Sequence, residues 1–284
     1  MANLHDIKRR ITSVRSTQKI TRAMKLVAAS KLRRAQEAIL QARPYAHRMR
    51  GLVNNLALRA DLDAHPLLRR TTGSGTVGLV VLTSDRGLCG GFNGNIVNAT
   101  RDKIETEFAG REIALTVIGK KGVDLLKRRG HAIHAAHIDV FEGPVMEAAG
   151  DIIAEVAQEF ATGGTDTVYC LYNAFRSAVS QEITLEQLLP FEPEPVESTP
   201  VDYRYEPSDT IVFDRLLAKH MQIQMHRILN ESAASEHGAR MTAMDSATNN
   251  AGDMIDRLTL QYNRARQDAI TTELIEVVSG AEAL

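Results

Sequence analysis

The C-terminal segment, residues 208–284, constrains the fold of this chain more than any other stretch. It contains no proline, and apolar side chains recur along it at alternating intervals of three and four residues. Nine successive positions of this kind include one polar residue; they are Met241, Met244, Thr248, Ala251, Ile255, Leu258, Tyr262, Ala265 and Ala269. The spacing is typical of a helix that packs along a second helix. As a single helix the segment would be about 110 Å long at ~1.5 Å per residue, so we expect it to project from any compact domain.

The apolar seam changes phase after Ala269. The next apolar positions on the helix are Ile270, Leu274, Val277 or Val278, and Ala281. A helix whose apolar face moves near its end is expected to change its packing partner there, so periodicity predicts that the last turns leave the second helix.

The N-terminal segment, residues 1–60, shows the same spacing and predicts the second long helix. Of seventeen heptad positions from Leu4 to Ala60, fourteen are apolar. The three exceptions, Gln18, Thr21 and Lys25, are consecutive along the seam. Two interpretations stay open for them: a tolerated polar layer that fixes the register of the helix pair, or a zone where a third molecule contacts the pair.

The charges of the two ends are opposite in sign. Residues 1–60 hold fourteen Lys/Arg against two Asp/Glu, whereas residues 208–284 hold seven against eleven. This complementarity favours pairing of the two helices. The formal net charge of the whole chain is −1, and Tyr45 is the one Phe, Trp or Tyr among the N-terminal basic residues, which is too few to stack on successive bases. We therefore expect no nucleic-acid partner.

The middle of the chain, residues 76–190, alternates between strand and helix patterns. Expected strands lie at 76–84, 112–119, 131–141, 167–174 and 178–188, the last two as a hairpin, and expected helices near 94–108, 120–129 and 144–160. Such alternation indicates an open α/β, Rossmann-like sheet. The predicted fold class is therefore α/β: a long antiparallel two-helix coiled coil from the terminal segments, 1–60 and 208–284, with the sheet domain, 76–190, inserted between them.

Three features of the middle segment are candidate chemical sites. Residues 87–94 form a glycine-rich turn after a strand, where dinucleotide folds bind phosphate. The spacing is not GxGxxG, however, and the second strand ends at Gly119-Lys120 without the acidic residue expected to bind the ribose. His131 and His137 would share one face of a strand with His134 on the other, which disfavours a metal site. Cys89 has no neighbouring base in the sequence and reads as a buried residue. We expect no catalytic residue, no cofactor and no metal.

One further function class is compatible with these patterns. A nucleotide-binding α/β enzyme that oligomerises through its terminal helices remains the alternative function.

No run of about 20 apolar residues suits a membrane span. The two cysteines are too few for a disulfide framework, which favours a reducing compartment.

Three stretches carry a family resemblance. Residues 7–36 (IKRRITSVRSTQKITRAMKLVAASKLRRAQ), residues 84–93 (SDRGLCGGFN) and residues 234–284, which begin ASEHGARMTAMDSATNNAGDM, resemble the gamma subunits of F-type ATP synthases. The resemblance implies a central rotor stalk that is itself non-catalytic. Its terminal helices would stand inside a ring of three alpha and three beta subunits, one copy per complex. The α/β domain would contact the small epsilon-type subunit and the membrane c-subunit ring of a proton-transporting complex.

The resemblance also implies roles for individual residues. The amino-terminal motif falls on Met24 and Lys25, and the carboxy-terminal motif on Arg266, Gln267, Thr271 and Glu276; these are expected to face the beta subunit's acidic catch loop and to hold the coil together. Ile270 and Leu274, with Ile275, Val277 and Val278, would turn in an apolar collar of alpha and beta subunits. Tyr203, Tyr205 and Glu206 are expected to contact the membrane ring.

The resemblance finally suggests a location. Chloroplast members carry a regulatory insertion with a cysteine pair, which this chain lacks, and its N-terminus shows no transit-peptide pattern. The expected location is therefore the cytoplasmic face of a bacterial plasma membrane, as a peripheral protein.

Overall fold

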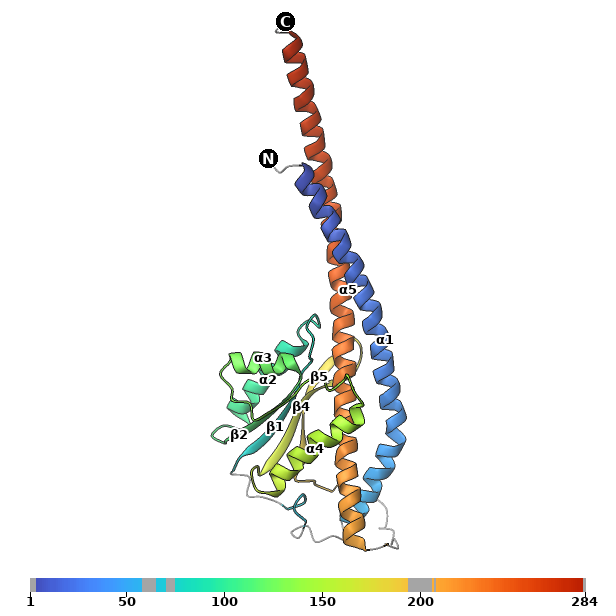
Figure 1. Cartoon of the computed structure of the whole chain (residues 1–284), viewed down its shortest axis with the longest axis vertical. Helices are drawn as coiled ribbons and strands as arrows, with labels where there is room; N and C mark the ends of the chain where they lie inside the picture. The colour runs from blue at the N-terminus through green and yellow to red at the C-terminus, as the bar shows by residue number, and fades with distance from the viewer. Residues whose placement is uncertain (1–3, 58–64, 70–74, 194–205, 207, 283–284) are drawn as a thin grey trace. The chain divides into compact units, whose positions relative to one another are not determined.

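A computed structural model describes residues 4–57, 65–69, 75–193, 206 and 208–282 (Figure 1). The chain forms two compact units: residues 1–28 together with 240–284, and residues 29–239. Two long helices, α1 (Leu4–Ala57) and α5 (Asp209–Glu282), contribute to both units. The prediction of two long terminal helices is confirmed.

The first unit is a pair of antiparallel helices. Lys25 of α1 contacts Asp245 of α5, Thr21 contacts Thr248, and Ile11 near the start of α1 packs with Leu258 further along α5. Partner numbers rise in α5 as they fall in α1, so the two helices run in opposite directions. Every described seam position of both helices, from Leu4 to Leu56 and from Met241 to Ala269, is buried or half-buried, as the heptad spacing predicts.

The second unit contains a five-stranded sheet with the order β3-β2-β1-β4-β5. The strands are β1 (Val77–Leu82), β2 (Ile113–Ile118), β3 (Ala135–His137), β4 (Thr167–Phe175) and β5 (Gln181–Leu189). The pairs β1–β2, β1–β4 and β2–β3 are parallel, and β5 is antiparallel to β4. The predicted open α/β sheet and its terminal hairpin are therefore present.

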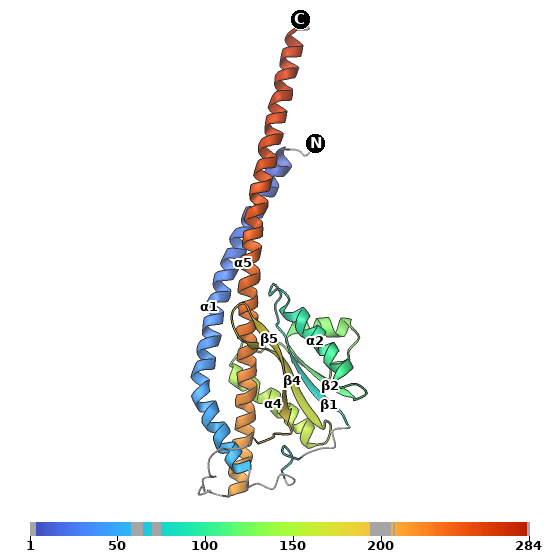
Figure 2. The same ribbon diagram turned by 180° about the vertical axis from the view of Figure 1, so that it is seen from behind.

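Helices cover both faces of this sheet (Figures 1 and 2). On one face, α2 (Phe92–Thr106) and α3 (Lys120–Arg128) pack on Val77, Leu79 and Val81 of β1. On the other face, Val80 and Leu82 pack with α4 (Val145–Ala161) and with the portions of α1 and α5 that belong to this unit. Because successive strand residues face opposite sides, a strand covered on both faces needs a continuous apolar run, which is the pattern that predicted β1.

The third strand differs from the prediction. β3 comprises Ala135–His137 alone, against the expected 131–141, and the positive φ of Asp139 (56°) takes the backbone out of the extended region just beyond it. His134 therefore precedes the strand and does not follow its alternation. Its Nε2 lies 3.2 Å from Glu159, and that of His137 lies 3.2 Å from Glu155, both on α4. The expectation that 134 and 137 face opposite ways was wrong for this reason.

The glycine-rich turn between β1 and α2 is closed by its own side chains. Asn93 Oδ1 accepts a hydrogen bond from the backbone N–H of Ser84 at 2.9 Å, and Asn93 Nδ2 donates to Ser84 Oγ at 2.7 Å. Cys89 is buried beneath them, and Leu88 and Gly90 adopt positive φ values of 63° and 58°. Glycine readily adopts the left-handed conformation, so Gly90 allows the backbone to make this turn.

Candidate partner-binding surface of the long helices

The three polar seam positions of α1 meet polar partners on α5. Thr21 Oγ1 and Thr248 Oγ1 share a hydrogen bond of 2.8 Å, and Gln18 Nε2 donates to the Thr248 carbonyl at 3.4 Å. Lys25 Nζ lies 2.6 Å from Asp245 Oδ1. These contacts form one continuous polar layer within an otherwise apolar seam.

The polar layer fixes register rather than adding much stability. The side chains of Lys25 and Asp245 are 39% and 46% exposed, and pairs as exposed as this contribute about 0–1 kcal/mol. A Cβ at Gly252 would lie 3.2 Å from Gln18 Nε2, so the glycine makes room for the amide. A shift of one helix along the other would break the hydroxyl pair and leave buried Thr21 facing apolar side chains.

An exposed apolar group flanks the polar layer on α1, and sequence reasoning missed it. Ile20, Leu26 and Val27 lie off the seam and are 57%, 66% and 58% exposed. Met24, which the family motif singled out, is half-buried between them. The available signal was the occurrence of large apolar residues outside the heptad positions of a basic helix.

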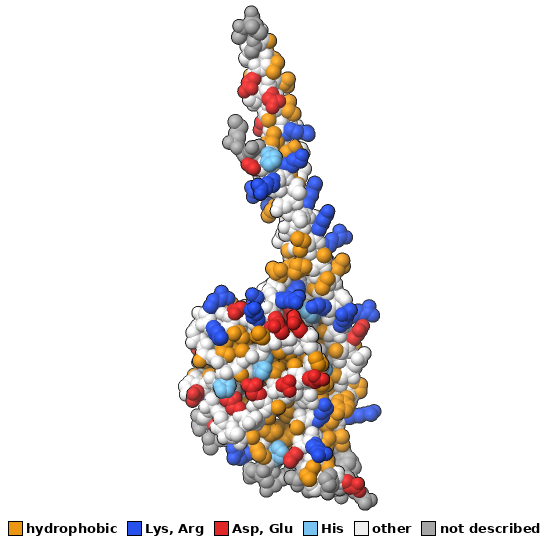
Figure 3. Space-filling model, viewed as in Figure 1, with side chains coloured by type: hydrophobic (Ala, Val, Ile, Leu, Met, Phe, Trp, Pro, Cys, Tyr) orange, Lys and Arg blue, Asp and Glu red, His pale blue; other side chains and the backbone are white. Residues whose placement is uncertain are grey.

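The C-terminal end of α5 extends beyond its contacts with α1. The last packed cluster contains Ile7, Ile11 and Leu258, with Tyr262 and Ala265 beside them. Beyond Ala269 the large apolar residues that the structure describes are all exposed, at 48% for Ile270, 60% for Leu274 and Ile275, 69% for Val277 and 57% for Val278. We call these five residues the apolar tip. Figure 3 shows hydrophobic and acidic side chains mixed along this end of the helix.

The carboxy-terminal motif lies on the same end of the helix. Arg266, Gln267 and Glu276 are exposed, as is Thr271, whose hydroxyl donates to the Gln267 carbonyl at 2.9 Å. Asp245, opposite Lys25, precedes Arg266 by about 30 Å at ~1.5 Å per residue. The structure therefore does not bring the amino-terminal and carboxy-terminal motifs together, and each presents a separate surface.

Of the three residues expected at the membrane ring, the structure describes Glu206 alone. Glu206 is exposed. Tyr203 and Tyr205 lie outside the described residues, so their role stays a prediction.

Among the described residues, no three His, Cys, Asp or Glu side chains are grouped so as to hold a metal ion. Across the same residues, no helix is both long and apolar enough to cross a bilayer.

Comparison with known proteins gives full-length matches. The profile of the family described as ATP synthase matches residues 3–284. The ATP synthase gamma chain of Geobacter metallireducens is 50% identical, over 100% of this chain and 99% of its own length. That of Heliobacterium modesticaldum is 46% identical, over 100% of both chains.

Solved structures match the same architecture. A chain in the central stalk and c-ring of the Tetrahymena thermophila mitochondrial ATP synthase is 26% identical, with a TM-score of 0.60 over 80% of this chain and 99% of that one. A chain in the OSCP/F1/c-ring part of the Euglena gracilis mitochondrial ATP synthase is 18% identical, with a TM-score of 0.70 over 99% of this chain and 94% of that one. The latter likeness concerns the fold alone.

Proposed function

Because the chain belongs to the ATP synthase gamma-chain family, the family of the central-stalk rotor, we propose that it transmits torque without catalysing a reaction itself. The observation that carries this proposal is the apolar tip: five exposed apolar residues on a single helix that has left its partner helix. An isolated chain gains nothing from exposing such a group, and exposed apolar surface marks contact sites. Apolar contact is also non-directional, so a collar around the tip need not hold it at one angle.

The proposed partners are three alpha and three beta subunits around the long helices, an epsilon-type small subunit and the c-subunit ring, with one copy of this chain per complex. The asymmetric surface of the helix pair would stabilise a different conformation of each beta subunit in turn. A rotor changes a nucleotide site only through such differences in contact free energy between conformations. We place the complex on the cytoplasmic face of a bacterial plasma membrane.

Individual residues take the following parts in this proposal. Lys25 is already engaged with Asp245, so it holds the register of the helix pair as well as facing a beta subunit. Arg266 is exposed, and a guanidinium suits a bidentate contact with a carboxylate. The group Ile20, Leu26 and Val27 adds an apolar contact next to the polar layer.

A vesicle assay tests the coupling role. The complete complex is reconstituted into vesicles, and ATP synthesis driven by an imposed proton gradient is measured with wild-type chain, with Arg266→Ala and with Arg257→Ala. Both arginines are exposed on α5, so the two variants differ in position rather than in charge removed. We expect Arg266→Ala to reduce synthesis at least several-fold and Arg257→Ala to leave it near wild type. Equal effects would remove the reason for assigning Arg266 to the contact, and synthesis without this chain would refute the proposal.

The non-catalytic part of the proposal has its own control. The isolated chain should not hydrolyse ATP, and a calorimetric titration of NAD or ATP into it should give no saturable heat. Tight binding of either nucleotide would favour the alternative enzyme class.

A further inference from the structure

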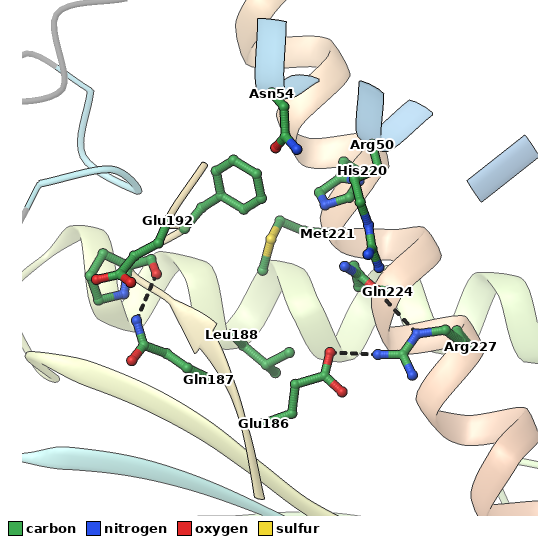
Figure 4. Close-up of a pocket in the computed structure, with 12 residues that line it drawn as sticks. Arg50, Asn54, Glu186, Gln187, Leu188, Glu192, His220, Met221, Gln224 and Arg227 are labelled. Carbon is green, nitrogen blue, oxygen red and sulfur yellow. Dashed lines mark hydrogen bonds and ion pairs between the residues drawn. The ribbon is translucent and has the colours of Figure 1, made fainter. Parts of the chain in front are cut away.

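The second unit contains a polar cavity that the rotor function does not use. Its volume is 510 Å³, and it is lined by the C-terminal part of α1, by the end of β5 with the residues after it, and by α5. Ligand pockets in proteins have volumes of roughly 300–1,000 Å³. Figure 4 shows the side chains of Arg50 and Asn54 reaching from α1 towards His220 of α5.

Two buried side chains in this cavity have unmet hydrogen-bonding capacity. His220 is 2% exposed, and neither of its ring nitrogens has a hydrogen-bond partner among the described residues. Asn54 is 6% exposed, and its Oδ1 accepts no hydrogen bond from any residue that the structure describes. Buried polar atoms are nearly always hydrogen-bonded in native proteins, so two such groups lining one cavity point to an occupant that supplies the missing partners.

The charges around His220 favour an anion. Four charged residues line the cavity: Arg50 from α1, Glu186 and Glu192 from β5 and the segment after it, and Arg227 from α5. Both carboxylate oxygens of Glu186 are engaged, one with Arg227 and one with the Tyr172 hydroxyl. Burial, together with the charges of Arg50 and Arg227, lowers the pKa of His220 to about 4. The charges that act on His220 are those of the two arginines and not those of the glutamates, so an anion suits the end of the cavity at His220 better than a cation does.

We propose that this cavity binds a small organic oxyanion, a phosphate ester or a polycarboxylate that also carries a hydroxyl group. Arg50 presents a fork of N–H donors that matches carboxylate and phosphate oxygens, and an N–H of His220 donates to the same group. The ligand hydroxyl donates to Asn54 Oδ1. Because α1, β5 and α5 all line the cavity, the bound anion links the sheet to both long helices. This inference is independent of the rotor proposal.

Histidine NMR on the full-length chain tests the site directly. Isotope-labelled histidine gives a signal for each ring, and His220→Gln identifies the signal of His220 by its loss. Inorganic phosphate and citrate are titrated separately near neutral pH. We expect a saturable shift of the His220 signal with at least one of them and a rise in its pKa when the ligand is bound. Tighter binding of phosphate indicates a phosphate ester, and tighter binding of citrate a polycarboxylate.

A matched pair of variants separates a site from general attraction of anions. Arg50→Gln removes the cavity arginine, whereas Arg48→Gln removes the same charge from an exposed position on the same helix. Loss of a charge-assisted hydrogen bond should weaken binding about tenfold or more in Arg50→Gln and less than about twofold in Arg48→Gln. No saturable shift with either ligand in the wild-type chain would overturn the proposal. Equal weakening by the two variants would overturn it as well.

Discussion

Arg227 supports the sharpest prediction about stability, because its guanidinium ties α5 to two strands of the sheet. It forms an ion pair with Glu186 of β5, and its Nη1 lies 3.2 Å from the Tyr172 hydroxyl of β4 and 3.1 Å from Glu231. Burial opposes the charge of Arg227, but Glu186 and Tyr172 raise its pKa above the ordinary value. Burial raises the pKa of Tyr172 well above its ordinary value, so the phenol stays protonated and donates to Glu186 at 2.9 Å.

The perturbation is Arg227→Met, which keeps much of the side-chain volume and removes the charge. Removing one partner of a buried ion pair costs about 3–5 kcal/mol. The side chains of Arg227 and Glu186 are 25% and 29% exposed, so we take the lower end, about 3 kcal/mol. For a unit of this size each kcal/mol lowers Tm by about 2–4 °C, so the expected fall is about 6–12 °C in a thermal unfolding experiment on the full chain.

The matched control is Arg176→Met. Arg176 also pairs with a glutamate of β5, Glu182, at 2.7 Å, but the two side chains are 66% and 56% exposed. Water screens so exposed a pair, which therefore adds little to stability, so Tm should fall much less than in Arg227→Met. A double-mutant cycle with Glu186→Gln should give a coupling of about 1–3 kcal/mol for Arg227. If Arg227→Met lowers Tm no more than Arg176→Met, the reasoning from burial is wrong.

Three further outcomes follow from the structure. The pKa of His220 is about 4 in the folded chain and about 6.5 in the unfolded chain. The free energy of unfolding should therefore be highest above pH 6.5 and fall by up to about 3 kcal/mol as the pH drops towards 4. Denaturant unfolding at several pH values should show this dependence, and His220→Phe should weaken it. A Cβ at Gly238 would lie 3.0 Å from the Ala178 carbonyl oxygen, so Gly238→Ala should lower Tm. Gly51 has open space around it, so Gly51→Ala should stabilise α1 by about 0.5–1 kcal/mol. A higher Tm for Gly238→Ala than for Gly51→Ala would contradict the close packing at Gly238. Leu274→Gln should leave the Tm of the isolated chain unchanged, because the side chain is 60% exposed, yet weaken assembly with alpha and beta subunits in a pull-down; normal assembly would argue against an apolar collar.

The long helices could be predicted from the sequence because heptad spacing is a local property of each segment. The exposed apolar tip followed in the same way from the phase change after Ala269. The pairing of Lys25 with Asp245 could not be predicted, because periodicity gives the face of each helix but leaves the register open by whole heptads. That register depends on where the rest of the fold returns the chain over the 220 positions that separate Lys25 from Asp245.

The sheet illustrates the same limit. β1 was recognisable because burial on both faces demands a continuous apolar run. β3 is a three-residue edge strand with no buried residue, so its apolar content carried little signal and its length was overestimated.

The buried polar groups of the second unit were not predictable either. Arg227, Glu186 and Tyr172 come from three elements, and Arg50 and His220 from two helices far apart in the sequence. In the sequence, none of these residues stands out from ordinary surface or seam positions. Their convergence depends on the packing of α1 and α5 against β5.

The central claim is that this chain turns inside the complex as ATP is hydrolysed, and a single-molecule rotation assay tests it most directly. Val179, in the β4–β5 hairpin, is 78% exposed, while Cys89 and Cys170 are buried, so Val179→Cys offers a selective attachment point for a bead. With the beta subunits fixed to a surface, the account predicts that the bead rotates in one direction on addition of ATP and stops when hydrolysis is inhibited. Hydrolysis at full rate with a correctly attached but stationary bead would contradict it.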